Sequence, residues 1–122
     1  MIIQGNIQTM QGPVPVESIK KGDLVVGMNH VPCEVTKVTK EELTKVSSFA
    51  LNPHLLISKG TRVKTVYGMK EAAGELLLVA TNGAEVPDTI SDEEGTFTGY
   101  EIYAEGTEVL MVDDYGVEVG KC

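Results

Sequence analysis

The chain has no tryptophan and contains only two cysteines, two histidines and two phenylalanines among 122 residues. Two cysteines, Cys33 and Cys122, are too few for a disulfide framework, so we expect a core that is held by apolar packing. The longest unbroken apolar run, Leu76 to Ala80, is far shorter than the ~20 residues that a membrane-spanning helix needs. No basic stretch followed by an apolar run opens the chain, so no signal peptide is recognisable. We therefore expect a cytoplasmic protein without a membrane partner.

Basic residues are nearly absent from the second part of the chain. Residues 71–122 hold thirteen acidic residues and one lysine, whereas residues 1–70 hold nine basic and five acidic residues. Phosphate binding needs clustered Lys and Arg, so this distribution argues against nucleic acid as the main ligand. Three explanations of this distribution are open. The basic and acidic parts could contact each other within the fold, they could contact each other between subunits, or the acidic part could be a solvated face. We favour the solvated acidic face.

Metal-binding residues are equally sparse. A zinc site would have to combine His30 and Cys33 with His54 and the distant Cys122. Structural zinc sites are built from two short pairs of ligands, and only one such pair is present here. The sequence also lacks an acidic calcium loop and a glycine-rich phosphate loop, which are the usual signatures of those ligands. We predict neither a metal nor a cofactor.

Alternation of apolar and polar residues is the commonest pattern that is present. It predicts half-buried strands at residues 33–39, 61–67 and 107–112. Asn82-Gly83 is the best hairpin candidate, as a two-residue turn with positive φ at both positions. Residues 88–99 are acidic and poor in apolar side chains, and we expect a loop there. The pattern is typical of an all-β fold, with residues 1–122 forming one domain.

Two segments share one plan. Residues 12–26 place Val16 and Ile19 three apart before Gly22, which predicts a single helical turn that ends at glycine and leads into a strand. Residues 67–79 contain a glycine, a short Ala-rich turn and an apolar strand, with a spacing that differs by about one residue. The shared plan indicates an internal duplication of strand, turn and strand, with coincidence as the alternative.

Three blocks of sequence carry a resemblance to a known family. They are GNIQTMQGPVPVESIKKGDLVVG (residues 5–27), FALNPHLLISKGTRVKTVYGMKEAAGEL (residues 49–76) and GYEIYAEGTEVLMVDDYGVEVG (residues 99–120). In this order and spacing the chain resembles the Hint domain of hedgehog proteins and inteins over nearly its whole length. The resemblance implies a pseudo-two-fold all-β fold of long bent strands and hairpins, with one or two short helical turns.

The resemblance also implies where the residues of self-splicing would lie. The family's first nucleophile, a Cys or Ser, corresponds to Met1. The family's Thr and His, three residues apart, bind the peptide that is cleaved, and the corresponding residues are Leu51 and His54. The His-Asn pair that ends the last strand of inteins corresponds to positions near Glu118 and Val119. These five residues are the candidate remnants of a catalytic site.

Most of this chemistry is missing from the sequence. Methionine has no ionisable nucleophile at position 1, and no asparagine follows Asn82, so cyclisation of a terminal asparagine is excluded. Without a preceding asparagine, Cys122 has nothing with which to exchange. We expect His54 to be a hydrogen-bonded residue in the core or at the start of a strand, and the surviving member of a dismantled site.

The favoured interpretation is therefore a Hint-like domain that has lost splicing and serves as a structural or protein-interaction module. It predicts protein partners in a larger assembly, with a bacteriophage virion or tail as one such setting, and it leaves self-association open. The location would then be the cytoplasm, or the virion if a phage encodes the chain. Two alternatives stay open. One is a self-processing domain or a fragment of one, and the other is a generic small β-barrel binding module.

Overall fold

The computed structural model describes residues 1–27 and 30–120, and this part of the chain is almost entirely β-structure. Twelve strands join in one sheet, and the paired strands run antiparallel. The prediction of an all-β fold is confirmed. The elements are β1 Ile2–Gln4, β2 Asn6–Thr9, β3 Gly12–Pro15, the 3-10 turn η1 Val16–Ser18, β4 Leu24–Val26, β5 Pro32–Phe49, β6 Asn52–Ser58, β7 Arg62–Thr65, β8 Gly68–Glu71, β9 Gly74–Val79, β10 Glu85–Ala104, β11 Val109–Val112 and β12 Tyr115–Glu118.

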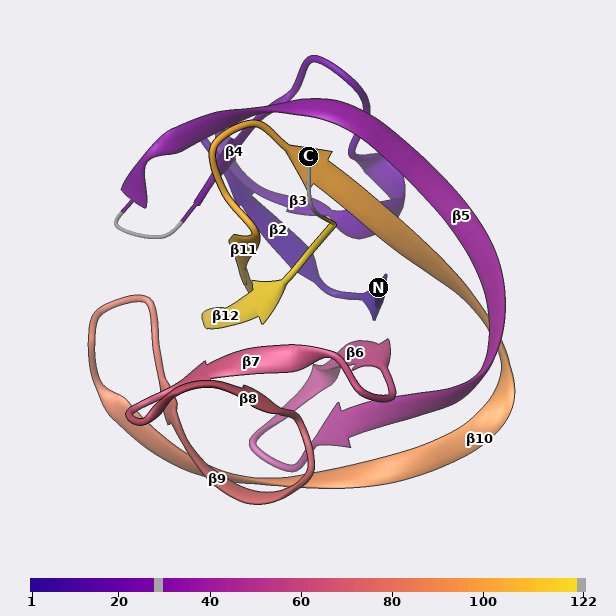
Figure 1. Ribbon diagram of the computed structural model, residues 1–122, viewed down its shortest axis with the longest axis vertical. Helices are drawn as coiled ribbons and strands as arrows, with labels where there is room; N and C mark the ends of the chain where they lie inside the picture. Colours follow the sequence, from indigo (N-terminus) through magenta and orange to yellow (C-terminus); the bar gives the residue numbers. More distant parts are fainter. Residues whose placement is uncertain (28–29, 121–122) are drawn as a thin grey trace.

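The two longest strands, β5 and β10, form the frame of the molecule. They pair from Phe49 and Ile90 at one end to Val35 and Ala104 at the other, with a bulge on β10 before Phe97. In Figure 1 they curve together around the shorter strands. The strands β4 and β6 pair with β5, and β1 and β9 pair with β10. The frame therefore fixes the places of both groups of shorter strands.

The prediction of a loop at residues 88–99 is wrong, because the whole segment lies within β10. Asp92, Glu93 and Glu94 pair with consecutive residues of β5, and residues 91–96 are exposed to solvent. Here the backbone ladder holds the strand, so its side chains do not need to alternate between apolar and polar. The alternation that reveals a half-buried strand is absent for that reason.

The molecule contains two halves with the same pairing. In the first half β2 pairs with both β3 and β4, and in the second half β7 pairs with both β8 and β9. Figure 1 shows β2–β4 and β7–β9 on opposite sides of the hairpin of β11 and β12. The strand–turn–strand repeat that was predicted from residues 12–26 and 67–79 is present.

Two threonines close the first turn of each half in the same way. The Thr9 hydroxyl donates to the Gly12 carbonyl over 2.6 Å and accepts the Gln11 N–H over 3.1 Å. The Thr65 hydroxyl donates to the Gly68 carbonyl over 2.7 Å and accepts from the N–H two residues further on, also over 3.1 Å. The halves thus agree in side-chain hydrogen bonding as well as in strand order.

The halves differ in length more than the sequence suggested. Val25 pairs with Thr9 and lies 16 positions after it, whereas Leu78 pairs with Thr65 and lies 13 positions after it. The expected difference of about one residue is therefore wrong, because the segment of the first half is three residues longer than that of the second half. The first half contains the predicted helical turn η1, while the second half has only a bend at Ala72.

The hairpin of β11 and β12 joins the two halves. Val112 of β11 pairs with Ile7 of β2, and Val117 of β12 pairs with Val63 of β7. All four side chains are fully buried in the core. Of the predicted strands, residues 33–39 lie within β5, residues 62–65 form β7, and β11 begins at residue 109 instead of residue 107.

The hairpin turn at Asn82-Gly83 differs from its predicted form. Asn82-Gly83 does connect two antiparallel strands, but only Gly83 has positive φ, and the loop spans three residues between Ala80 and Ala84. The two-residue turn with positive φ at both positions is instead Asp113-Asp114, between β11 and β12. Aspartate tolerates this conformation better than most residues with a Cβ.

The equivalence of the two threonine turns can be tested by substitution. Thr9→Val and Thr65→Val each remove one hydroxyl that donates and accepts a hydrogen bond. We expect each variant to lose about 1 kcal/mol of unfolding free energy in urea titrations. Thr44→Val, on the exposed part of β5, is the matched control and should change stability less. A loss at only one of the two turns would contradict their equivalence.

Candidate functional site

The backbone of residue 1 sits in a socket of hydroxyl groups. The Met1 amine donates to Ser58 Oγ over 2.9 Å and to Thr61 Oγ1 over 3.3 Å. The two hydroxyl oxygens are 2.8 Å apart. On its other side, the Met1 carbonyl accepts the Ser58 N–H over 2.9 Å. Ser58 therefore binds residue 1 through both its backbone and its side chain.

A tight turn brings the two hydroxyls together. Ser58 is the last residue of β6, and Thr61 precedes β7. The Thr61 N–H donates to the Ser58 carbonyl over 3.1 Å, and Gly60 between them has a φ of +92°. A glycine suits this position because it adopts positive φ without a steric cost. The turn therefore points both hydroxyls at the start of β1.

Carboxylates surround the same amine. Glu101 of β10 lies 4.0 Å from it, and Glu118 of β12 is held by two hydrogen bonds from the Arg62 guanidinium. Burial lowers the pKa of the Met1 amine, and the charges of Glu101 and Glu118 oppose this shift. Burial likewise raises the pKa of Glu101, which the positive amine opposes. The amine thus lies in a partly desolvated, polar environment.

The side chain of Met1 covers the frame beside the socket. Its Cβ and Sδ would each lie 3.3 Å from a Cβ at Gly99 of β10, and Leu43 Cδ1 would lie 2.6 Å from it. Residue 99 therefore has no room for a side chain. The thioether of Met1 has no acidic proton and is a weak hydrogen-bond acceptor. The socket can orient the backbone of residue 1, but the side chain there supplies no nucleophile.

The structure brings some of the predicted site residues together. Glu118 lies close enough to the Met1 amine for its charge to affect the pKa of that amine. Val119 is buried, and its N–H donates to the Glu108 carbonyl over 2.8 Å. The Gly120 N–H donates to the Ile102 carbonyl, directly beside Glu101 in β10. The end of the last strand and the first residue therefore meet on β10.

His54 lies apart from this group. Of the two expected settings, the core and the start of a strand, the structure shows the second: His54 is near the start of β6, and its side chain is 52% exposed. Its Nδ1 lies 2.8 Å from Asp113 Oδ2, and its carbonyl accepts the Gln4 side-chain amide over 2.8 Å. No hydrogen bond joins His54 to Met1 in the part of the chain that the structure describes.

His54 and Asn52 together hold the turn of the last hairpin. The Asn52 side-chain amide donates to the Asp113 carbonyl, and the Asp113 N–H donates to the Asn6 carbonyl over 3.0 Å. Asp113 is one of the two aspartates with positive φ in this turn. These contacts stabilise the positive φ of Asp113, which is otherwise an unfavourable backbone conformation. In this geometry the His54 side chain contacts the turn between β11 and β12.

Leu51 is also remote from the socket, with a side chain that is 65% exposed. Its N–H donates over 3.0 Å to the buried carboxylate of Asp88, which also accepts the Thr89 N–H and the Tyr115 hydroxyl, each over 2.8 Å. Burial, together with this hydrogen bond to Asp88, raises the pKa of Tyr115 well above its usual value. Asp88 thus ties the turn after β5 to β12.

Sequence reasoning missed Ser58, Thr61 and Glu101. The available signal was the spacing, because Ser58 and Thr61 are three residues apart, as are Leu51 and His54. We chose Leu51 and His54 because this pair contains a histidine, although serine and threonine hydroxyls can also hydrogen-bond to a peptide group. Only the pairing of β1 with β6 shows which pair faces residue 1.

The structure also bears on metals and membranes. Among residues 1–27 and 30–120, no three His, Cys, Asp or Glu side chains are arranged to hold a metal ion. His30 is exposed and Cys33 is buried, while Cys122 lies outside the described residues. In the same part of the chain, no helix has the length and apolar character to span a membrane.

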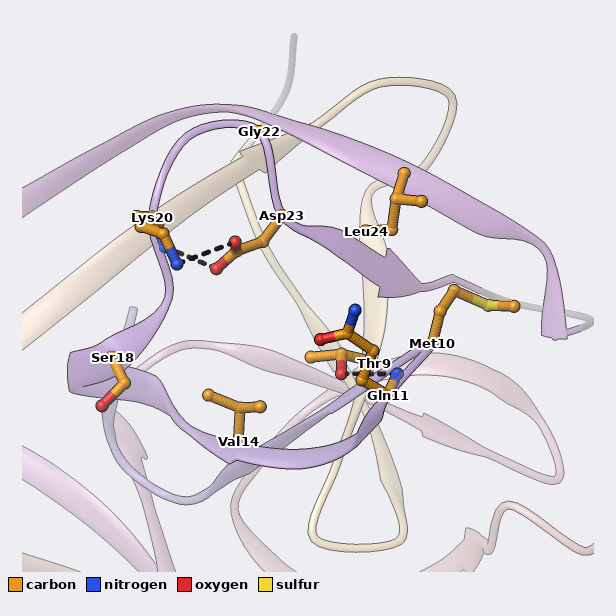
Figure 2. A pocket seen from close by; sticks show the side chains of 9 residues that line it. All are labelled: Thr9, Met10, Gln11, Val14, Ser18, Lys20, Gly22, Asp23 and Leu24. Carbon is orange, nitrogen blue, oxygen red and sulfur yellow. Dashed lines mark hydrogen bonds and ion pairs between the residues drawn. The ribbon is translucent and has the colours of Figure 1, made fainter.

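A groove of about 430 Å³ lies on the first half, away from the socket. Figure 2 shows Met10, Val14 and Leu24 at this groove, with Lys20 paired to Asp23 at its rim. Met10 and Leu24 are among the exposed large apolar side chains of the protein. Lys20 to Asp23 belong to the segment that makes the first half longer than the second.

Comparison with solved structures identifies the fold. The gp41-1 intein matches with a TM-score of 0.75 and 19% identity, over 95% of this chain and 94% of that chain. The MchDnaB-1 intein matches with a TM-score of 0.73 and 11% identity, over 97% and 99% of the two chains. A DnaB intein from Synechocystis sp. PCC 6803 matches with a TM-score of 0.70 and 16% identity, over 98% of both chains. No protein-family model and no curated protein sequence matches the chain.

These similarities show that the chain has the Hint fold of inteins. The resemblance inferred from the three sequence blocks is confirmed at the level of fold. A generic β-barrel whose resemblance is accidental is not consistent with matches over nearly the whole length of each chain. Sequence identity below 20% does not extend the comparison to chemistry, which depends on individual side chains.

The partly buried carboxylate of Glu101 should affect the pH dependence of the unfolding free energy. Its pKa is raised in the folded state, so the folded protein binds this proton more tightly than the unfolded chain does. The contribution of Glu101 to stability is therefore present at low pH and is lost as the pH rises through the raised pKa. In urea titrations, we expect the unfolding free energy of Glu101→Gln to increase relative to that of the unsubstituted protein as the pH rises above the ordinary pKa of glutamate. Glu93→Gln changes an exposed residue of the same strand and is the control. The pH dependence of its unfolding free energy should follow that of the unsubstituted protein.

If the unfolding free energy of Glu101→Gln also followed that of the unsubstituted protein at every pH, the raised pKa of Glu101 would be contradicted.

We expect His54 to have a structural role, and this role predicts a loss of stability when the side chain is truncated. His54→Ala removes the side-chain contact to Asp113 and should lower the unfolding free energy by about 1 kcal/mol. Leu51→Ala, at an exposed side chain three residues earlier, is the control and should stay within about 0.5 kcal/mol. Unchanged melting of His54→Ala, together with the loss of an activity, would overturn the structural assignment.

Proposed function

We propose that this protein is a Hint domain that carries out no splicing and serves as a structural or protein-interaction module. The observation that carries the proposal is the set of groups around residue 1. Ser58 and Thr61 contact its backbone, and Glu101 and Glu118 lie nearby. Residue 1 has neither a thiol nor a hydroxyl on its side chain, and the set contains no imidazole and no side-chain amide, the other groups that the splicing chemistry uses.

We further infer that Ser58 and Thr61, and not Leu51 and His54, occupy the place of the family's Thr-His pair. They have the same spacing and bind the backbone of residue 1. A threonine hydroxyl can orient a peptide group, but it does not exchange a proton near neutral pH as an imidazole does. The socket thus keeps the positioning part of the device and lacks its acid–base part.

The last strand supports the same conclusion. Glu118 is engaged by the Arg62 guanidinium, and Val119 is a buried aliphatic residue. The charge-assisted hydrogen bonds to Arg62 engage the carboxylate at this position. Neither side chain can cyclise onto the backbone as an asparagine amide does. Both chemical steps therefore lack their reacting group.

For its partners we propose other proteins within a larger assembly, and we propose a bacteriophage virion or tail as one such setting. The net charge of −8 supports protein over nucleic acid as the partner. The exposed part of the β5–β10 pair and the groove at Met10 and Leu24 offer contact surfaces. A homo-oligomer and a location in the cytoplasm belong to the same proposal. Copurification with the products of neighbouring genes would test it.

A fusion experiment distinguishes this proposal from a self-processing domain. The chain is expressed between two globular fusion partners, and the products are measured by intact mass. We expect one uncleaved polypeptide, because residue 1 has no nucleophile and residues 118–119 have no asparagine. The gp41-1 intein in the same fusion is the positive control. Cleaved or ligated products from this chain would contradict the proposal.

Restoring residues tests which pair faces the cleavage point. Met1→Cys combined with Thr61→His places a thiol and an imidazole at the socket, whereas Met1→Cys combined with Leu51→Thr completes the pair that contains His54. We expect thiol-induced cleavage of the upstream fusion partner to be about 100-fold faster in the first variant, the usual scale of acid–base catalysis by one group. Equal rates, or faster cleavage in the second variant, would reject the assignment of Ser58 and Thr61.

A further inference from the structure

The loop between β9 and β10 contains an asparagine in an unusual setting. Asn82 and Gly83 are both exposed, and the loop is closed by a hydrogen bond from the Ala80 N–H to the Ala84 carbonyl over 2.9 Å. The Asn82 side-chain oxygen accepts the Ala84 N–H, also over 2.9 Å. A side-chain amide, a glycine nitrogen and a backbone donor thus lie within three consecutive residues.

We propose that Asn82 is a site of spontaneous covalent modification, through cyclisation onto the nitrogen of Gly83. The Gly83 nitrogen loses its proton and attacks Asn82 Cγ, so that a new C–N bond closes a five-membered succinimide ring. The bond from Cγ to Nδ2 then breaks, and ammonia leaves with that proton. Addition of one water molecule opens the ring to an aspartate or an isoaspartate at position 82. The step needs only water and no enzyme.

The loop supplies a donor where charge develops. When nitrogen attacks Cγ, the side-chain oxygen of Asn82 becomes negative in the tetrahedral intermediate. The Ala84 N–H already donates to that oxygen, as oxyanion-hole donors do in acyl transfer. Among the described residues other than Asn82, Gly83 and Ala84, no heavy atom lies within 4 Å of the position that a Cβ would occupy on Gly83, so residues outside the loop tip do not crowd the attack. The hydrogen bond from the Gly83 N–H to the Ala80 carbonyl has to break first.

The same reaction is disfavoured at the other asparagines that the structure describes. Asn52 precedes Pro53, which has no N–H to act as the nucleophile. Asn6 precedes Ile7, a β-branched residue that is fully buried and paired with β3 and β11. Asn29 lies outside the described residues. Among residues 1–27 and 30–120, Asn82 is therefore the preferred site.

Modification would act on a loop that is tied to the last hairpin. The Thr81 N–H donates to the Asp114 carbonyl over 3.0 Å, and Asp114 belongs to the turn with positive φ. The product adds a negative charge next to this aspartate turn, and an isoaspartate also adds one carbon to the backbone of a three-residue loop. We expect the modified form to unfold at a lower urea concentration than the unmodified form.

The test uses the folded full-length protein, incubated at mildly alkaline pH and physiological temperature. Intact mass, ammonia release and peptide mapping with isoaspartyl methyltransferase labelling follow the reaction. We expect conversion at position 82 while the amides of Asn6 and Asn52 stay intact. Asn82→Gln should abolish the early ammonia release, since glutamine would have to close a larger ring. Asn6→Gln is the matched control and should leave the release unchanged.

A synthetic peptide that spans residues 79–86 shows whether the conditions permit the chemistry. Reaction of the peptide, with position 82 of the folded protein unchanged over the same period, would overturn the proposal, because the loop would then protect its asparagine. Ammonia release that persists in Asn82→Gln would overturn it as well, because another residue would then be the source.

Discussion

The hydrogen-bond ladder between β5 and β10 is the interaction on which the other elements depend. It joins segments more than forty residues apart along its whole length, from Ile90 and Phe49 to Ala104 and Val35. Each of its strands has a second edge, and β4, β6, β1 and β9 pair there. The two halves therefore pair with the same two long strands, and the hairpin of β11 and β12 lies between the halves and pairs with both. Pairing of such distant segments is slow to form, because the chain must first close a long loop.

The socket at residue 1 is a product of this arrangement. Ser58 and Thr61 come from the turn after β6, Glu101 from β10 and Glu118 from β12, and the frame brings these elements together. The backbone geometry that binds residue 1 is thus set by strand pairing, whereas the chemistry depends on a few side chains. This chain has the Hint fold of inteins with methionine, serine, threonine and valine at positions 1, 58, 61 and 119.

The sequence was sufficient for the fold class, because Cys33 to Thr39 and Arg62 to Thr65 alternate as half-buried strands do. The repeat was also visible, since η1 and β4 follow a recognisable glycine pattern. Residues 91–96 could not be predicted, because a solvated ladder leaves no trace in side-chain polarity. The site was only partly predictable for a related reason. Met1 and Glu118 followed from their positions in the chain, but the choice between His54 and the Ser58–Thr61 pair depended on the register of β6 against β1.

The meeting of the first and last described residues on β10 has one further consequence. Met1 contacts Glu101, and Gly120 is bonded to Ile102, the next residue of the same strand. If this domain were inserted into a host polypeptide, with the host joined before residue 1 and after residue 120, the two points of attachment would therefore lie close together. Surface loops of folded proteins accept inserted domains when the ends of the guest lie this close. The geometry makes this domain a suitable guest for grafting into an exposed loop of another protein, where both proteins could keep their folds.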